Sequence, residues 1–320
     1  MYFLGIDGGG SQARALLADE AGNILGEGRS GPCNPCTQSE ESCFEQLQSA
    51  IQGAFVARCR ESGFITAAHL GVAGAGDPSA RMILESVADQ LFDRNATQVG
   101  ISHDLKIGHA GGLVGQAGCA LVAGTGSACY GVNSQGKEVL TGGWGDLVDD
   151  AGSGGWIGLR ALQLCLRQAD GRAPGNDLQR GVLRFLGLES IEQIKRRIHI
   201  VGLSRDERAK LAPVIFDLAQ SGDAMAKQIV EEAVRELTLL VQCNFKKLSF
   251  NTPQLVVLGG LTNSIYFRER LAASIQAVVP SVAITQPRLS ANAGAVLLAM
   301  QAAGVRVDEA VFGRMSNCLT

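Results

Sequence analysis

Three glycine-rich segments each follow a run of apolar residues, and their composition suits contact with an anion. They are residues 5–11, 124–127 and 258–263. Glycine has no Cβ, so successive backbone N–H groups in such loops can approach a phosphate without obstruction. Asp7 in the first segment would lie where Mg²⁺ neutralises phosphate charge, directly or through water. The first two segments predict opposed loops that hold a polyphosphate. The candidate contacts in the first loop are Asp7, Gly8, Gly9, Gly10 and Ser11, and those in the second are Gly124, Thr125, Gly126 and Ser127.

The third segment has a different context, because a buried strand precedes it and a helix follows it. At such a turn the base or sugar of a nucleotide can pack on bare backbone at the carboxyl end of a sheet. The alternative is an ordinary tight turn, and a plain hairpin is the alternative for the first segment. The first segment matches neither the P-loop pattern nor the G-x-G-x-x-G pattern of a βαβ unit, since a strand follows it. P-loop and Rossmann sites are therefore disfavoured.

The apolar periodicity around the first loop predicts an α/β sheet. Residues 2–7, 13–19 and 24–28 are typical of a three-stranded meander. The elements expected after it are a helix from about Ser39, a strand over 67–74, a helix over 79–92 and a strand over 97–104. The last of these strands ends on Asp104. Alternation of this kind builds a sheet with helices on its faces.

The second glycine loop partly repeats this arrangement. Residues 119–127 mirror residues 3–11. The elements expected after them are strands over 129–132 and 138–140, a helix over 224–245 and a strand over 254–258. We expect the last helix, residues 292–303, to pack back on the first half. The simplest interpretation is two related α/β halves that face each other.

The bulk composition limits the class of protein. A chain of 320 residues exceeds the roughly 250 to 300 residues at which single cores stop growing, so two domains are expected. The formal charge of -3, from 28 basic and 31 acidic residues, and the lack of a long Lys/Arg run argue against a nucleic-acid partner. No apolar stretch approaches the roughly 18 residues of a membrane helix, and the first residues do not resemble a signal peptide. We therefore expect no membrane association and a cytoplasmic location.

The nine cysteines are interpreted mostly as small buried hydrophobes in a reducing compartment. Cys33 and Cys36 form a CxxC pair, which could be half of a metal or cluster site. No second CxxC or nearby His pair completes a set of four zinc ligands. Metal binding by these sulfurs is therefore disfavoured.

The glycine segments resemble the phosphate 1, phosphate 2 and adenosine motifs of the actin, heat-shock ATPase and sugar kinase superfamily. More closely, the chain resembles the N-acetylglucosamine kinases of the family that includes the BadF/BadG/BcrA/BcrD-type activating ATPases. The similarity extends essentially end to end, and its most specific stretch is residues 142–158. In the family that stretch usually reads Gly-Asp-Glu where this chain has Asp149-Asp150-Ala151. Ala151 thus replaces the usual glutamate, and this difference affects what can be inferred about the detailed structure of the loop and about sugar selectivity.

This resemblance implies an α/β fold of duplicated actin-like (ribonuclease H-like) ATPase domains that flank a cleft. The expected domains are residues 1–115 plus 290–320, and residues 116–289. ATP with Mg²⁺ would bind at the bottom of the cleft and a hexose at its mouth. The implied reaction is transfer of phosphate to the 6-hydroxyl of an amino sugar, with N-acetylglucosamine as the expected substrate. The partner is then a small sugar, and a homodimer is compatible with the sequence.

The resemblance also implies roles for individual residues. Asp104 falls on the family's catalytic acid, and a carboxylate at a strand end can accept the proton of an attacking hydroxyl. The alternative role for Asp104 is a helix N-cap. The alternative for Trp144 is a residue of the hydrophobic core. The residues expected around the sugar are Asn34, Gly143, Trp144, Gly145 and Asp150. Those expected around the nucleotide, besides the two phosphate loops, are Ala209, Gly259, Gly260 and Asn263.

Three rival functions stay open from the sequence. A glucosamine kinase of the same fold is the nearest. A BadF-type activase would hydrolyse ATP to drive electron transfer from an iron-sulfur cluster shared between subunits. Cys33 and Cys36 are compatible with this hypothesis. A non-catalytic sugar sensor would keep the fold without the chemistry, which the presence of Asp104 argues against.

Overall fold

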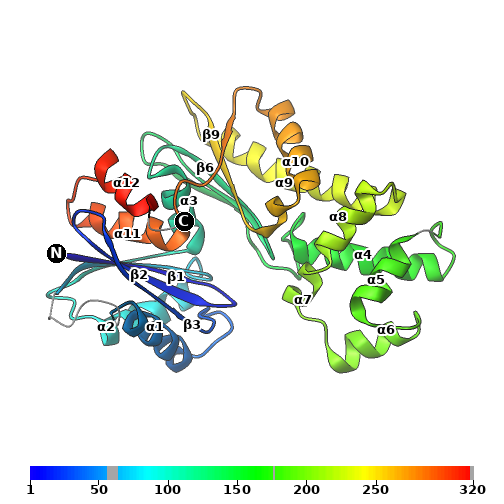
Figure 1. Cartoon of the computed structure of the whole chain (residues 1–320), viewed down its shortest axis with the longest axis horizontal. Helices are drawn as coiled ribbons and strands as arrows, with labels where there is room; N and C mark the ends of the chain where they lie inside the picture. The colour runs from blue at the N-terminus through cyan, green and yellow to red at the C-terminus, as the bar shows by residue number, and fades with distance from the viewer. Residues whose placement is uncertain (56–63, 176, 318–320) are drawn as a thin grey trace. The chain divides into compact units, whose positions relative to one another are not determined.

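The computed structural model describes residues 1–55, 64–175 and 177–317. The chain divides into two compact units, Met1–Gln116 with Gln286–Thr320, and Ala117–Thr285 (Figure 1). Residues 56–63, 176 and 318–320, which the expected domains include, lie outside the described residues. No helix within the described ranges is long and apolar enough to span a bilayer.

The first unit contains a five-stranded sheet in the order β3-β2-β1-β4-β5. Its strands are β1 (Tyr2–Gly8), β2 (Ala13–Asp19), β3 (Ile24–Ser30), β4 (Ile65–Val72) and β5 (Gln98–Ser102). The first three form an antiparallel meander, whereas β4 and β5 run parallel to β1. The meander and the two following strands predicted from the sequence are confirmed. The last strand is shorter than expected, because it ends at Ser102 and not at Asp104.

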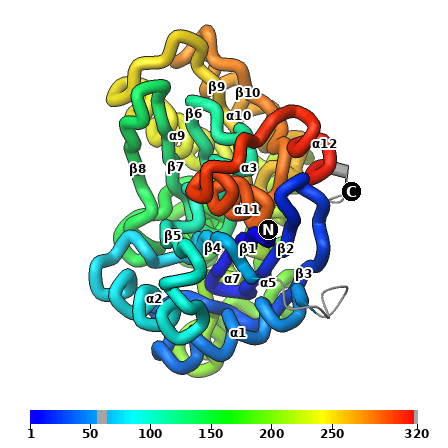
Figure 2. Tube along the Cα trace, turned by 90° about the vertical axis from the view of Figure 1, so that its left-hand side faces the viewer, coloured from blue at the N-terminus to red at the C-terminus, as the bar shows by residue number. Residues whose placement is uncertain are grey.

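Helices cover both faces of the first sheet (Figure 1). They are α1 (Glu40–Phe55) and α2 (Pro78–Leu91) on one face, and α3 (Asp104–Leu113) and α11 (Ala291–Ala302) on the other. Alternate residues of β1 divide between these faces: Leu4 packs in a cluster with Leu47 of α1, and Phe3 packs with Val296 of α11. Figure 2 shows α1 and α2 side by side along the sheet. The expectation that residues 292–303 pack on the first half is confirmed.

A further helix, α12 (Glu309–Asn317), follows α11, so the expectation that residues 292–303 form the last helix is wrong. Asp308 caps α12, since its Oδ1 accepts the N–H groups of Ala310 and Val311 at 3.0 and 2.9 Å. Val311 and Met315, four residues apart, are buried in the same cluster as Phe3. A buried pair on so short a helix gives only a weak periodic signal in the sequence.

The second unit repeats the strand plan of the first, in a sheet of order β10-β9-β6-β7-β8. Its strands are β6 (Gly118–Ala123), β7 (Ser127–Val132), β8 (Glu138–Gly142), β9 (Gln254–Leu258) and β10 (Ala283–Thr285). Strands β6 to β8 form an antiparallel meander, and β9 and β10 run parallel to β6. This repetition confirms the predicted duplication of an α/β unit.

The helical elements of the second unit lie mostly between β8 and β9. They are α4 (Gly154–Ala169), α5 (Asp177–Leu186), α6 (Gln193–Arg196), η1 (Arg197–Val201), α7 (Arg205–Ala209), α8 (Ala212–Gln220) and α9 (Ala224–Lys247), with η2 (Gly260–Asn263) and α10 (Ile265–Val278) after β9. Helix α9 contacts three of the strands, and α4, α8 and α10 pack around it. The core of this unit therefore extends from the sheet through α9 to the helices packed around it.

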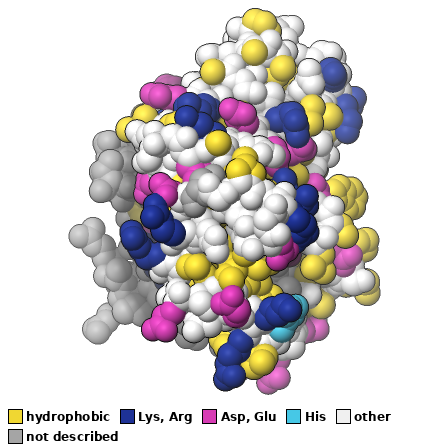
Figure 3. Space-filling model, turned by 90° about the vertical axis from the view of Figure 1, so that its right-hand side faces the viewer, with side chains coloured by type: hydrophobic (Ala, Val, Ile, Leu, Met, Phe, Trp, Pro, Cys, Tyr) yellow, Lys and Arg dark blue, Asp and Glu magenta, His cyan; other side chains and the backbone are white. Residues whose placement is uncertain are grey.

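The charged side chains of both signs are mixed on the face of the molecule drawn in Figure 3, where Lys and Arg alternate with Asp and Glu. Among the described residues drawn there, no continuous basic area crosses that face.

Candidate active site

Two carboxylates lie at the carboxyl edge of the first sheet. Strands β1, β4 and β5 are parallel neighbours, so their carboxyl ends meet at one edge. Asp7 is the penultimate residue of β1, and Asp104 follows the end of β5 by two residues. Gly74 follows the end of β4, which lies between them. In open α/β sheets this edge is where ligands bind.

Asp104 is the first residue of α3 and does not cap the helix. The N-cap is His103, whose Nδ1 accepts the N–H of Lys106 at 3.2 Å. Asp104 Oδ1 accepts the N–H of Leu105 at 3.1 Å. A carboxylate in the first helical turn is favoured by the helix dipole. The N-cap alternative for Asp104 is therefore wrong, and its second carboxylate oxygen has no hydrogen bond shown to the described residues.

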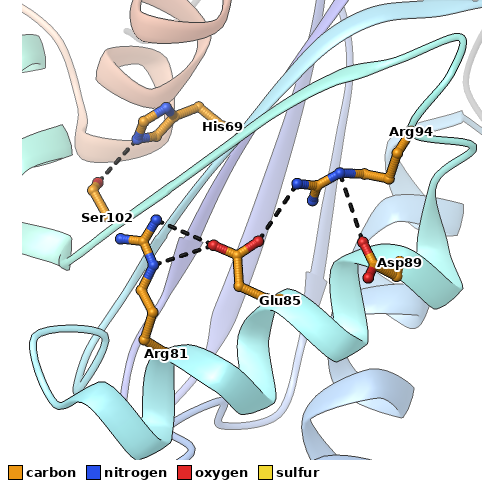
Figure 4. Close-up of polar contacts among 6 residues, drawn as sticks. All are labelled: His69, Arg81, Glu85, Asp89, Arg94 and Ser102. Atoms are coloured by element: carbon orange, nitrogen blue, oxygen red, sulfur yellow. Dashed lines mark hydrogen bonds and ion pairs between the residues drawn. The ribbon is translucent and has the colours of Figure 1, made fainter.

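A buried hydrogen bond fixes the strand end that precedes Asp104. His69 of β4 and Ser102 of β5 are joined by a contact of 2.9 Å between Nε2 and Oγ (Figure 4). Burial, together with the nearby cations Lys106 and Arg81, lowers the pKa of His69 to about 4. The imidazole is therefore neutral at pH 7. Figure 4 also shows Glu85 of α2 paired with Arg81 of the same helix and with Arg94, which follows the helix.

The two carboxylates influence each other electrostatically. The pKa of Asp7 is raised to about 6, because burial and the charge of Asp104 raise it more than Arg14, directly opposite on β2, lowers it. Burial also raises the pKa of Asp104, against the effect of the Leu105 N–H. Two partly buried carboxylates of this kind favour a bound cation or a shared proton.

The described residues contain no group of three or more His, Cys, Asp or Glu side chains that could hold a metal. Mg²⁺ commonly takes only one or two carboxylates and completes its six ligands with phosphate oxygens and water. The like charges of Asp7 and Asp104, with the raised pKa of Asp7, fit an ion that arrives with a nucleotide. They do not fit a metal caged entirely by protein.

The first glycine loop is a tight turn whose tip is open. The N–H of Gly9 bonds to the carbonyl of Gln12 at 2.9 Å, and Gly9 and Gly8 in turn accept the N–H groups of Cys33 and Ala73 at 2.9 and 2.7 Å. A Cβ built at Gly10 would meet nothing within 4 Å. The base of the loop is therefore anchored, while the backbone at Gly10 is free to contact a ligand.

Asn34 lies against the turn that follows β4. Its Oδ1 accepts the N–H of Cys36 at 3.0 Å, and its own N–H donates to Gln38 Oε1 at 2.9 Å. Gly74 has φ +87°, and a Cβ there would lie 2.6 Å from Asn34 Oδ1 and 2.7 Å from Cys36 Sγ. Glycine is therefore required at position 74. The structure brings Asn34 to the same sheet edge as Asp7 and Asp104.

The second and third glycine segments touch each other in the second unit. Gly259 has φ +100°, and a Cβ there would lie 2.8 Å from the backbone N of Gly124. The first N–H groups of α4, at Gly154 and Gly155, donate to the carbonyls of Gly124 and Thr125 at 2.8 and 3.1 Å. These bonds hold the loop 124–127 at the start of α4.

Two further predicted nucleotide contacts lie around these segments. Ala209 lies beside the start of α4, since a Cβ built at Gly154 would lie 3.1 Å from its Cβ. Asn263 is exposed at the end of η2, three residues beyond Gly260. Ala209 is thus brought next to the loop 124–127, while no contact of Asn263 with that loop is shown.

The segment 143–150 combines exposed apolar side chains with two anchored acids. Trp144 is 80% exposed, so its alternative role as a core residue is wrong. Asp150 is only 2% exposed, has φ +54°, and forms an ion pair with Arg205. Asp146 forms a second ion pair, with Arg208. Gly143 and Gly145 also have positive φ, so the loop carries Trp144 outward on a backbone that needs glycine on both sides.

Asp150 lies beside the second phosphate loop. A Cβ built at Gly126 would lie 3.0 Å from Asp150 Oδ2, and Ser127 Oγ donates to the carbonyl of Ala151 at 2.9 Å. Burial raises the pKa of Asp150, whereas Arg205 lowers it. Sequence reasoning missed Arg205, because it stands 55 residues from its partner and matches no short motif.

The CxxC pair does not present two sulfurs to solvent. Cys33 is fully buried and hydrogen-bonds with the thiol of Cys43, whereas Cys36 is exposed. The hydrogen bond with Cys43, followed by burial, raises the pKa of Cys33 far above its usual range. A cluster shared between two subunits requires accessible thiolates, so Cys33 is unsuited to that role.

Comparison with known proteins identifies proteins that are similar to this chain. The profile of the "BadF/BadG/BcrA/BcrD ATPase family" matches residues 4–299. The N-acetylmuramic acid/N-acetylglucosamine kinase of Clostridium acetobutylicum is 31% identical over 93% of this chain and 98% of its own length. The glucosamine kinase of Vibrio cholerae is 27% identical over 75% of this chain and 79% of its own length.

A solved structure shares the fold. It is a protein of Chromobacterium violaceum, provisionally assigned as an N-acetylglucosamine kinase, with TM-score 0.75 and 24% identity over 93% of this chain and 98% of that one. At this identity the likeness establishes the fold alone. The predicted duplicated actin-like α/β fold is confirmed.

Proposed function

Because the chain belongs to the BadF/BadG/BcrA/BcrD ATPase family, we propose that it is an ATP-dependent kinase that phosphorylates the 6-hydroxyl of an amino sugar. N-acetylglucosamine is the preferred acceptor in this proposal. The observation that carries it is the placement of Asp7 and Asp104 at one carboxyl edge of the first sheet, where the charge of one raises the pKa of the other.

Asp104 is the proposed general base. The oxygen of the sugar 6-hydroxyl forms a bond to the γ-phosphorus of ATP, the bond from that phosphorus to the bridging oxygen breaks, and ADP leaves. The hydroxyl proton passes to Asp104. Burial raises the pKa of Asp104, which makes it a stronger base than an exposed aspartate. Its attachment to the start of α3 fixes the carboxylate in place.

The phosphates are assigned to the first two glycine loops. In the first unit the residues proposed for this role are Asp7, Gly8, Gly9, Gly10 and Ser11, and in the second unit Gly124, Thr125, Gly126 and Ser127. Mg²⁺, when bound, would be held by Asp7 through water and would neutralise phosphate charge. Ala209, Gly259, Gly260 and Asn263 are assigned to the rest of the nucleotide.

The sugar is assigned to Asn34 in the first unit and to Gly143, Trp144, Gly145 and Asp150 in the second. The exposed indole of Trp144 suits an apolar sugar face or an acetyl methyl group, and amide and carboxylate groups suit hydroxyls. Asp150 is ion-paired with Arg205 in this structure, so its proposed role is to accept a sugar hydroxyl while it keeps that ion pair.

A glucosamine kinase is the second candidate, and the relative from Vibrio cholerae supports it. Asp149, where the family usually has glycine, adds a carboxylate near Asp150 that would favour a cationic amine. An activase that uses an iron-sulfur cluster is disfavoured, since Cys33 is buried against Cys43.

Steady-state kinetics on N-acetylglucosamine, glucosamine, N-acetylmuramic acid and glucose at one pH test this assignment. The proposal predicts the highest kcat/KM for an N-acetylated sugar, with glucose about tenfold lower if only an acetyl methyl is buried. Glucosamine ahead of N-acetylglucosamine by more than tenfold would move the assignment to a glucosamine kinase. Glucose ahead of all three would remove the amino-sugar assignment.

A further inference from the structure

Arg205, in the first turn of α7, lies against the second phosphate loop. A Cβ built at Gly126 would overlap Arg205 Nη2, and one built at Gly155 would lie 3.2 Å from Arg205 Cγ. The stem of Arg205 therefore packs along the start of α4, and its guanidinium borders the turn at Gly126. This places a cation beside backbone that is proposed to bind phosphate.

The position of Arg205 is fixed from both sides. Ser204 and Glu207 form a capping box at the start of α7, with hydrogen bonds of 2.9 and 3.2 Å. Beyond the helix, Arg205 Nη2 donates to Asp150 Oδ2. The Nε of Arg205 is buried and has no hydrogen-bond partner within the described residues. A guanidinium has five N–H donors, so it can hold Asp150 and still offer donors to a second anion.

We propose that Arg205 binds the phosphate chain of the nucleotide at the loop 124–127 while it keeps its bond to Asp150. The inference rests on the proposed function, because it takes ATP as the ligand of that loop. Arg205 then joins two parts of the site: the phosphate on one side and, on the other, the segment 143–150 that is proposed to contact the sugar. Arginine suits this role, since its planar fork can serve two anions at once.

Arg208 provides a matched control on the same helix. It pairs with Asp146 of the same segment, and its Nε is likewise buried without a partner in the described part of the chain. The atoms nearest to a Cβ built at Gly126 belong to Arg205 and Asp150, and none of them belongs to Arg208. The two arginines therefore share their helix, an aspartate partner and a buried Nε. They differ in contact with the phosphate loop.

The test compares variants in which no buried carboxylate is left unpaired, because removing Arg205 alone would strand Asp150 and destabilise the fold. Asp150→Asn is compared with the double variant Asp150→Asn/Arg205→Gln, and Asp146→Asn with Asp146→Asn/Arg208→Gln. Isothermal titration calorimetry measures the affinity for ATP, ADP and adenosine in the presence of Mg²⁺. Thermal unfolding of every variant establishes that it is folded.

The expected result is a loss of ATP affinity of about ten- to a hundredfold on adding Arg205→Gln, the size of a lost charge-assisted hydrogen bond. Adenosine affinity stays unchanged, and adding Arg208→Gln changes ATP affinity by no more than about threefold. The inference is overturned if adding Arg205→Gln leaves ATP affinity unchanged, or if adding Arg208→Gln lowers it equally. Either result leaves the proposed function intact. A wild-type protein that binds no ATP removes the proposed function together with it.

Discussion

Asp7 and Asp104 lie at the same edge of the first sheet, on either side of β4, and the charge of Asp104 helps to raise the pKa of Asp7 to about 6. The two residues are 97 positions apart, and only the parallel order β1-β4-β5 brings them together. This pair organises the proposed chemistry, with Asp104 directed to the attacking hydroxyl and Asp7 to the metal and phosphate.

The change Asp104→Asn should lower kcat by roughly 10²- to 10⁴-fold, the range for loss of a general base. Sugar binding and the fold should persist, because asparagine keeps the side-chain oxygen that accepts the Leu105 N–H. Stopped-time ADP assays and sugar titration by calorimetry measure the two effects. The control is Asp77→Asn at the same sheet edge, where asparagine still caps α2. A kcat within a few-fold of wild type in Asp104→Asn would show that no base is needed.

The change Gly10→Val should raise the KM for ATP or abolish turnover, because a branched side chain blocks backbone approach to phosphate. A Cβ at Gly10 meets no protein atom within 4 Å, so stability should not change. Gly126→Val is a poorer probe, since its side chain would collide with Arg205. Gly313→Val, also in open space but on α12, is the control. If Gly10→Val instead abolished sugar binding measured without nucleotide, the loop would belong to the sugar site.

The change Trp144→Ala should reduce the preference for N-acetylglucosamine over glucose by up to about tenfold, the value of one buried methyl group. Trp144 is 80% exposed, so its loss should not affect folding. The ratio of kcat/KM for the two sugars is the measurement. Leu147→Ala, on the same loop and also exposed, is the control and should leave that ratio unchanged. An unaltered preference in Trp144→Ala would place the acetyl group elsewhere.

The change His69→Gln tests the buried bond to Ser102 through its pH dependence. The folded pKa of about 4 lies below the ordinary value of 6.5, so between these values the unfolded chain binds the additional proton. The contribution of His69 to the free energy of unfolding is fully present above pH 6.5. It decreases as the pH drops toward 4, by up to about 3 kcal/mol. Glutamine does not titrate, so the difference in unfolding free energy between wild type and His69→Gln should be smaller at pH 4 than at pH 7.

Denaturant unfolding of both proteins at several pH values measures this difference. Asp7 and Asp104 have raised pKa values, so they act in the opposite direction, but they are present in both proteins and cancel in the comparison. A difference in unfolding free energy that is constant from pH 7 to pH 4 would show that His69 is not held neutral.

The fold was predictable where the chain repeats a local pattern. The strands around Leu4 and Leu121 are short apolar runs that end in glycine turns, and their repetition predicts two related sheets. Helix α12 escaped prediction because only Val311 and Met315 carry its buried stripe. Asp104 was assigned to a strand end, since nothing in the sequence places the strand's end at Ser102 and the helix cap at His103.

The candidate site was predictable to the extent that glycine and acidic residues recur at strand ends. Arg205 could not be found this way, because its importance arises from contact with Asp150 and Gly126, both distant in sequence. The burial of Cys33 against Cys43 was equally invisible, since CxxC spacing says nothing about which sulfur faces the core.

The most direct test of the central claim is to incubate the wild-type protein with ATP, Mg²⁺ and N-acetylglucosamine and to quantify ADP and sugar phosphate together by ³¹P NMR. The account predicts one 6-phosphorylated sugar for each ADP and only background ADP without sugar. ADP release that does not depend on sugar and yields no sugar phosphate would contradict it, and would indicate an ATPase in place of a kinase.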